Sequence, residues 1–392
     1  MYFGPFPAFL RIPLNLIYPA GRGAWSRFSG FCAGVIALSA FAGLIAAALR
    51  ASSLSAGARN WLGNACLAGF VLGSPLLLLL GNPSIYNEAI IWGFAWSLAA
   101  LFFACRSLNT TGRALTFSIL GFSLCAVGAL LSRVTFGTPL LLIAPLLALH
   151  LPPENRWRRL AALFLPLGAG LAFYILLSYA RFGTLIGVSF DHYINPVHRE
   201  FAHHYGIFSL RRVPYGFADY FGLRFPSFEA QPPFLRADRH FYPHPSLYSL
   251  PFSETYLPIT WSSSWLLFGA IMGMICLFRK NYSGLVERGI TAALVVQCIC
   301  VLSFYALAQR YSVDLYPFLI FCTLVFLRSG GTVLARTRYF LVGLVAMSIV
   351  INSLTTASWL INADPNVRPE TRAAWNKILG RKPASSENNE AR

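Results

Sequence analysis

The stretch FCAGVIALSAFAGLIAAAL, which runs from Phe31 to Leu49, decides the fold class of this chain. It carries no charge, and its apolar side chains cover every face of a helix instead of alternating as they do in the strands of a membrane barrel. Its length matches the roughly 20 residues that a helix needs to cross about 30 Å of hydrocarbon. We therefore predict that this stretch is a transmembrane helix.

Similar apolar stretches recur along the whole chain of 392 residues, of which 56% are hydrophobic and only 11% are charged. A chain with a mean hydropathy of +0.58 has too little polar surface to coat a water-soluble globule. This excludes a soluble enzyme, and the number of stretches excludes a receptor with a single anchor. All eight cysteines lie in these stretches, where they behave as small hydrophobic side chains and carry no redox message.

We predict an all-α polytopic membrane protein with ten transmembrane helices. The apolar stretches are 31–49, 61–80, 89–105, 115–131, 138–149, 159–179, 261–278, 289–308, 314–327 and 338–358. The fifth and the ninth stretches are short, and the prolines in them are expected to kink them or make them partly re-entrant.

The net charge of +17 would suit a nucleic-acid partner if the cations gathered on one folded face, but they are spread through short loops. Among the short loops the basic residues are strongly biased: the alternate loops 50–60, 106–114, 150–158, 279–288 and 328–337 and their immediate flanks hold thirteen Arg and Lys residues, whereas the short loops opposite hold only Arg133 and Arg310. By the positive-inside rule these loops are cytoplasmic, so we expect membrane lipid and not nucleic acid around the chain. The C-terminal tail, which is external in this topology, fits the rule poorly because it holds five Arg and Lys residues up to Lys382.

This topology divides the chain into five parts. The predicted parts are an external interfacial segment broken by prolines (1–30), a bundle of six spans (31–179), an external loop with interfacial helices (180–260), a bundle of four spans (261–360) and an external, partly disordered tail (361–392). Three GxxxG pairs, which begin at Gly30, Gly69 and Gly269, indicate close packing of helices.

Ionisable residues at membrane depth are costly and therefore indicate where a polar site lies. Five of them fall at the predicted external edge of the spans, namely Glu88, Arg133, Arg181, Arg310 and Asp314. Taken singly, each has the alternative explanation of a snorkelling or helix-terminal charge. Taken together, three cations and two carboxylates on one rim resemble a polar cavity.

Such a cavity suits a phosphate-linked substrate whose lipid tail stays in the bilayer. Arginine forks bind phosphate oxygens, and a carboxylate can remove a proton from an attacking hydroxyl. Three tyrosines could stack on a sugar, although the aromatic belt is the alternative for each: Tyr86, Tyr193 and Tyr311. The histidines of DHYINPVHREFAHHYG lack the spacing of a helical zinc pair, so we predict no protein metal site, while a divalent cation stays open as a cofactor.

Several segments together resemble the bacterial membrane glycosyltransferases of the GT-C superfamily, in the branch of glycosyltransferase families 39 and 83. These segments are YFGPFPAFLRIPL, SIYNEAIIWG, SRVT, LSYARFGTLIGVSFDHY and QRYSVDLYPFLI. The resemblance implies a multi-helix bundle that takes a sugar from a polyprenyl-phosphate donor and transfers it to a glycan, lipid or protein acceptor of the cell envelope. It also implies a location in the bacterial cytoplasmic membrane, with the reaction on the external face.

The resemblance assigns roles to individual residues. Arg310 and Tyr311 match the late Arg-Tyr motif that engages donor phosphate, and Asp314 would orient that motif. Glu88 matches an acidic position of the second external loop, and with Asp314 it forms the predicted catalytic pair. The remaining predicted substrate-binding residues are Arg133, Arg181, Tyr86, Asp191 and Tyr193.

One departure from the family pattern concerns the front of the chain, which begins inside the FGP segment. The family's principal acidic residue lies before this segment, in the first external loop, after a first transmembrane helix. We expect the natural gene to encode this helix and loop upstream of Met1. A non-catalytic envelope-assembly subunit and a lipid-linked saccharide transporter are the alternative functions, although a transporter should show deeper charges or a two-half repeat.

Overall fold

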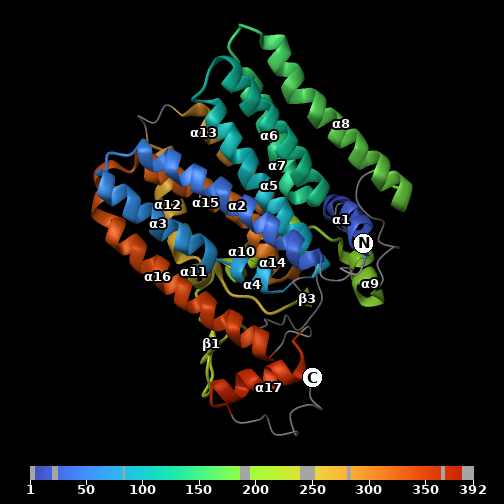
Figure 1. Ribbon diagram of the computed structural model, residues 1–392, viewed down its shortest axis with the longest axis vertical. Coiled ribbons are helices and arrows are strands. Elements are labelled where there is room, and N and C mark those ends of the chain that lie inside the picture. The colour runs from blue at the N-terminus through green and yellow to red at the C-terminus, as the bar shows by residue number, and fades with distance from the viewer. Residues whose placement is uncertain are drawn as a thin grey trace.

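The computed structural model describes residues 5–19, 25–82, 84–185, 195–238, 252–279, 284–362 and 367–381 (Figure 1). Its α-helices are α1 Phe6–Ile17, α2 Trp25–Arg50, α3 Ala56–Leu72, α4 Leu76–Gly81, α5 Ile85–Ser107, α6 Gly112–Ser132, α7 Val134–Leu149, α8 Arg156–Phe182, α9 Pro196–Tyr205, α10 Val213–Tyr220, α11 Ile259–Ser262, α12 Ser264–Leu277, α13 Leu285–Leu302, α14 Gln309–Ser312, α15 Tyr316–Ser329, α16 Gly331–Asn362 and α17 Pro369–Ile378. Two 3₁₀ turns, η3 Leu210–Arg212 and η4 Val313–Leu315, and four two-residue strands complete the described elements.

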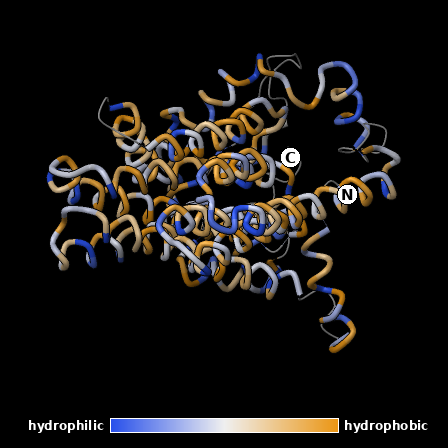
Figure 2. Tube along the Cα trace, turned by 90° about the horizontal axis from the view of Figure 1, so that it is seen from above, coloured by the Kyte–Doolittle hydropathy of each residue, from blue (hydrophilic) through white to orange (hydrophobic). Residues whose placement is uncertain are grey.

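Seven helices are long and apolar enough to cross a membrane: α2, α5, α6, α8, α13, the continuous segment from α14 to α15, and α16. The chain is therefore an all-α, multi-pass membrane protein, as its composition predicts. Figure 2 shows hydrophobic residues along most of these helices. The other three predicted spans correspond to α7, to α12 and to the pair α3 and α4, which are shorter, so the total of ten stays a prediction.

The prediction of one helix over 61–80 is wrong, because the helix breaks between Leu72 and Leu76. A break at membrane depth needs internal partners for the freed carbonyl groups. The carbonyl oxygen of Gly73 accepts hydrogen bonds from Ser263 Oγ at 3.2 Å and Trp265 Nε1 at 3.3 Å. Side chains at the start of α12 thus complete the backbone of the broken segment. The stretch 289–308 likewise ends its helix early, at Leu302.

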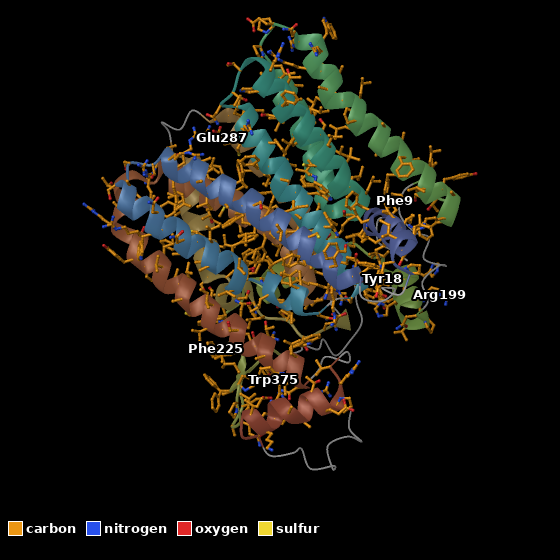
Figure 3. The ribbon with its side chains drawn as sticks, viewed as in Figure 1. Phe9, Tyr18, Arg199, Phe225, Glu287 and Trp375 are labelled. Carbon is orange, nitrogen blue, oxygen red and sulfur yellow. The ribbon has the colours of Figure 1, made fainter. Side chains whose placement is uncertain are left out.

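The N-terminal segment is one helix, α1, and not the series of short pieces that its prolines predict. Pro7 lies in the first turn, where a backbone N–H has no helical partner in any case, and Pro13 lies in the second half of the helix, so few hydrogen bonds are lost. Aromatic contacts hold the helix against the bundle, since the ring of Phe6 lies 5.2 Å from that of Trp92, and Phe9, labelled in Figure 3, lies 5.8 Å from Phe173.

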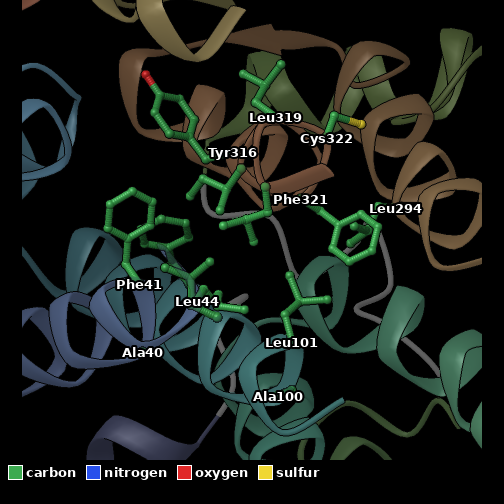
Figure 4. Close-up of a cluster of buried hydrophobic side chains, with 14 of the residues drawn as sticks. Ala40, Phe41, Leu44, Ala100, Leu101, Leu294, Tyr316, Leu319, Phe321 and Cys322 are labelled. Atoms are coloured by element: carbon green, nitrogen blue, oxygen red, sulfur yellow. The ribbon is translucent and has the colours of Figure 1, made fainter. Parts of the chain in front are cut away.

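Helix α5 runs through the centre of the bundle and packs against α2, α6, α7 and α15. The core between α2 and α15 contains Phe41, Leu101 and Tyr316, all buried (Figure 4). Helix α8, by contrast, packs mainly on α6 at the outer edge of the bundle, and most of its surface is free of protein contact (Figure 1).

The segment between α8 and α12, predicted as interfacial helices, contains α9 and α10 and also short strands in its described residues. Strands β1 Ser227–Phe228 and β2 Leu235–Arg236 form an antiparallel pair, and β3 Phe252–Ser253 runs parallel to β4 Ala306–Leu307. Buried Arg212 donates to the carbonyl oxygens of Tyr205, Gly206 and Ile207, which lie at the end of α9. Burial lowers the pKa of His198, and its ring Nδ1 lies at hydrogen-bond distance, 2.9 Å, from the Tyr305 hydroxyl.

Two of the GxxxG pairs lie at close helix contacts, as predicted. A Cβ on Gly273 would overlap the backbone carbonyl of Cys322 in α15, and a Cβ on Gly69 would lie 3.0 Å from the ring of Trp265. The pair that begins at Gly30 is looser, since a Cβ at that position would meet its nearest neighbour, Ile91, only at 4.0 Å.

We expect Gly273→Ala to lower the free energy of unfolding by about 1 to 3 kcal/mol, because the added methyl group forces α12 away from α15. Unfolding of the purified protein in detergent micelles by sodium dodecyl sulfate measures this loss. Gly343→Ala in α16 is the matched control, since a Cβ there meets nothing within 4 Å among the described residues. Equal stability of the two variants would contradict the close contact.

Candidate functional site

All five predicted rim residues lie at helix ends within the described residues, and four of them lie at the start of α5, at the α6–α7 junction and directly before α15. Glu88 lies in the first turn of α5, Arg133 joins α6 to α7, and Arg310 and Asp314 precede α15 in α14 and η4. At the opposite end of α5 and α15, Arg328 pairs with Glu287 at 3.0 Å, and Figure 3 labels Glu287 there. Two further predicted residues, Asp191 and Tyr193, lie outside the described residues.

The central feature is an ion pair between Arg133 and Asp314. The single extended residue Arg133 separates α6 from α7, and its Nε donates to Asp314 Oδ1 at 3.1 Å and to Thr135 Oγ1 at 3.0 Å. The Thr135 hydroxyl donates in turn to Asp314 Oδ1. Asp314 is fully buried, whereas 15% of the Arg133 side chain is exposed, so the pair lies just inside the protein surface. Asp314 is predicted to orient the Arg310–Tyr311 motif, but its carboxylate contacts Arg133 and Thr135 in the structure, and the orienting role stays a prediction.

Two guanidinium groups lie close to the ring of Tyr311. Arg133 is 5.3 Å from the centre of its ring and Arg310 is 5.1 Å from it. Arg310 also lies 5.5 Å from the ring of Tyr86, and it forms an ion pair with Glu254 from the segment before α11. Cations held over aromatic rings lose little conformational freedom when a ligand binds. The two arginines, two tyrosines and two carboxylates form what we call the arginine cluster: Tyr86, Arg133, Glu254, Arg310, Tyr311 and Asp314.

Glu88 belongs to a different cluster. It is buried, with 2% of its surface exposed, and its Oε2 lies 3.1 Å from Arg11 Nη2 of helix α1. Residues two apart on a helix project in directions about 200° apart, so Tyr86 faces Arg310 while Glu88 faces α1 and α2. The structure thus divides the predicted rim into two ion-paired clusters on different faces of α5.

Arg181, the remaining predicted rim residue, lies in the last turn of α8 and is exposed. Its guanidinium lies 4.9 Å from the ring of Phe182. It belongs neither to the Arg133–Asp314 pair nor to the Arg11–Glu88 pair.

Three residues of these clusters were not singled out from the sequence: Arg11, Thr135 and Glu254. Arg11 and Thr135 lie within the segments YFGPFPAFLRIPL and SRVT, whose position in the chain gave no sign of their partners. Glu254 lies outside every motif, 56 residues before Arg310. Only the folded bundle brings these residues together.

Within the described ranges, no group of three or more His, Cys, Asp or Glu side chains lies close enough to hold a metal ion. A small cleft of about 20 Å³, with room for about one water molecule, lies beside the arginine cluster and is lined by Pro75, Leu78, Ala237, Thr255, Tyr256, Leu257, Gln309, Asn352, Thr355, Thr356 and Trp359. Gln309 directly precedes Arg310, so the cleft and the cluster are on neighbouring sides of α14. Most of the exposed lining is apolar, so the cleft as it stands is too small and too apolar to hold a sugar.

No family model, curated protein or solved structure matches this chain.

We expect Asp314→Ala to lower the free energy of unfolding by about 3 to 5 kcal/mol, because it leaves Arg133 largely buried without its counter-charge. The same detergent titration measures the loss. Glu254→Ala removes a carboxylate whose side chain is 53% exposed, so it should cost less than about 1 kcal/mol. If Asp314→Ala lowered the free energy of unfolding by no more than Glu254→Ala, that is by less than about 1 kcal/mol, the buried pair would not stabilise the bundle.

Proposed function

We propose that this chain is a membrane glycosyltransferase that moves a sugar from a polyprenyl-phosphate donor to a glycan, lipid or protein acceptor. The observation that supports this proposal best is the arginine cluster. Two guanidinium groups lie on Tyr311 at one end of a membrane bundle, and each keeps part of its surface open. A phosphate whose lipid tail lies in the bilayer would meet two cations there.

The two ion pairs of the cluster differ in how easily they open. The Arg133–Asp314 pair is nearly closed to solvent, so separating it would leave an uncompensated buried charge. The Arg310–Glu254 pair is more exposed and is worth at most about 1 kcal/mol. A donor phosphate would therefore displace Glu254 from Arg310, while Asp314 keeps Arg133 in place beneath Tyr311.

This exchange offers a proton acceptor for the attacking hydroxyl. A carboxylate base must lie within hydrogen-bond reach of that hydroxyl. Asp314 is fully buried and Glu88 is buried against Arg11, whereas Glu254 is exposed beside Arg310. Glu254 is therefore our choice for the base among the described residues, and Glu88 and Asp314 would act through the arginines that they hold.

The finer topology is part of this proposal. It comprises ten spans with a GT-C-like arrangement, a bacterial cytoplasmic membrane, and an external location for the arginine cluster. The cluster lies at the end of the bundle opposite the arginine-rich loops, as the positive-inside rule requires of an external site.

The two alternative functions would use the arginine cluster to bind a phosphate but would transfer no sugar. A lipid-linked saccharide transporter would bind the phosphate and release it unchanged, and a non-catalytic assembly subunit would bind without transfer. Glycosyl transfer from a defined donor separates the enzyme from both. A panel of polyprenyl-phosphate hexoses and pentoses, presented to the protein in liposomes, is the appropriate donor set.

Arg310→Lys should lower kcat/KM for transfer roughly ten- to a hundredfold, since lysine keeps the charge but loses the fork that binds two phosphate oxygens. Arg328→Lys is the matched control, because Arg328 carries the same charge at the other end of the bundle. If Arg310→Lys transferred sugar as fast as the wild type, the arginine cluster would not be the site that binds the donor phosphate. Sugar movement without transfer by the wild-type protein would favour the transporter.

The proposed orientation has its own test. We expect a cysteine at Leu223 to react with an impermeant maleimide in intact cells and a cysteine at Trp157 to react only after the membrane is opened. Both side chains are exposed, at 78% and 84%, so accessibility depends on the side of the membrane. The reverse labelling pattern would place the arginine cluster in the cytoplasm and exclude an external reaction.

A further inference from the structure

The first turn of α8 holds an arrangement of charge that a helix does not favour by itself. Three of its first four residues are arginines, namely Arg156, Arg158 and Arg159, and the first turn has no acidic residue. The residue before it, Asn155, makes no side-chain capping bond. Helix N-termini carry partial positive charge and free N–H groups, so cations there are repelled and an anion is attracted.

Arg159 gives a second reason to expect an anion at this turn. Only 4% of its surface is exposed, and its Nε and Nη1 are buried without a hydrogen-bond partner among the described residues. A buried guanidinium without a counter-charge is costly unless an anion reaches it. The carboxylate nearest in sequence, Glu154, is exposed and forms no ion pair within the described part of the chain.

The position of this turn identifies the kind of anion. Helix α8 forms the outer edge of the bundle, and most of its surface faces away from protein (Figure 1). Its first turn therefore lies beside the lipid headgroups, where anionic lipids supply phosphate. Trp157, between the arginines, is 84% exposed, as is common for tryptophans at the membrane interface.

We propose that the first turn of α8 is a binding site for the phosphate of an anionic phospholipid. Arg159 donates to the phosphate from within the bundle, Arg156 and Arg158 donate from the exposed face, and the free N–H groups of the turn add to the attraction. The site lies at the end of α8 away from α1, so it is separate from the arginine cluster and does not depend on the proposed enzymatic activity.

The test compares protein in nanodiscs of phosphatidylcholine alone with protein in nanodiscs that also contain phosphatidylglycerol. Native mass spectrometry counts the phosphatidylglycerol molecules that stay bound after the protein is released from the nanodisc. We expect retention of one phosphatidylglycerol to fall at least tenfold in Arg159→Gln. The exposed double variant Arg156→Gln/Arg158→Gln, which leaves the buried position intact, should fall about fivefold or more. Arg50→Gln, an exposed arginine at the end of α2, is the matched control and should retain lipid as the wild type does.

Each result decides the proposal. Loss of phosphatidylglycerol retention in both α8 variants but not in Arg50→Gln supports the lipid site. The exposed double variant gives this result independently of any folding defect in Arg159→Gln. Equal retention by the wild type and the exposed double variant would overturn the site. Inorganic phosphate that raises the unfolding temperature of the wild type as much as phosphatidylglycerol does would show that the site binds a free anion and not a lipid.

Discussion

The bundle depends on one constraint: a polar group inside a membrane protein has no water to bind and must find its partner within the chain. The Arg133–Asp314 pair meets this constraint where two helix connections approach each other, the α6–α7 junction and the start of α15. Thr135 bonds both members, so the connection between the two halves of the bundle is fixed in direction as well as in distance. Tyr311 and Arg310 take their positions from this fixed point.

The same constraint explains why α3 can break inside the bundle. The freed carbonyl of Gly73 is bonded by Ser263 and Trp265, and the Ser263 hydroxyl is also 2.5 Å from that of Tyr316. A polar network therefore runs from the broken helix to the core of the second half. The small, mostly apolar cleft lies beside it, since Pro75 and Leu78, which follow the break directly, line this cleft.

Sequence patterns predict the apolar helices well because length and hydropathy are local properties. They also place Arg133, Arg310 and Asp314 at one end of the bundle, since helix ends follow from the apolar stretches. The pairing of these residues is not a local property of the sequence. Asp314 lies 181 residues from Arg133, and Glu88 pairs with Arg11 and not with Arg310. The break at Gly73 also escapes prediction, because the side chains that make it tolerable, Ser263 and Trp265, come from the start of α12, 190 and more residues away.

Helix α16 has 32 residues, so at 1.5 Å per residue it is about 48 Å long, against roughly 30 Å of hydrocarbon. It must tilt, or its last turns must stand clear of the bilayer. Those turns carry one wall of the cleft, from Asn352 to Trp359, and Ile351 packs with Leu235 of β2 and Leu257. Packing on α3 and α12 fixes the direction of α16 within the bundle, so bilayer thickness sets how far this wall stands above the lipid. A thicker membrane would draw the mouth of the cleft toward the headgroups, whereas a thinner one would lift it into water.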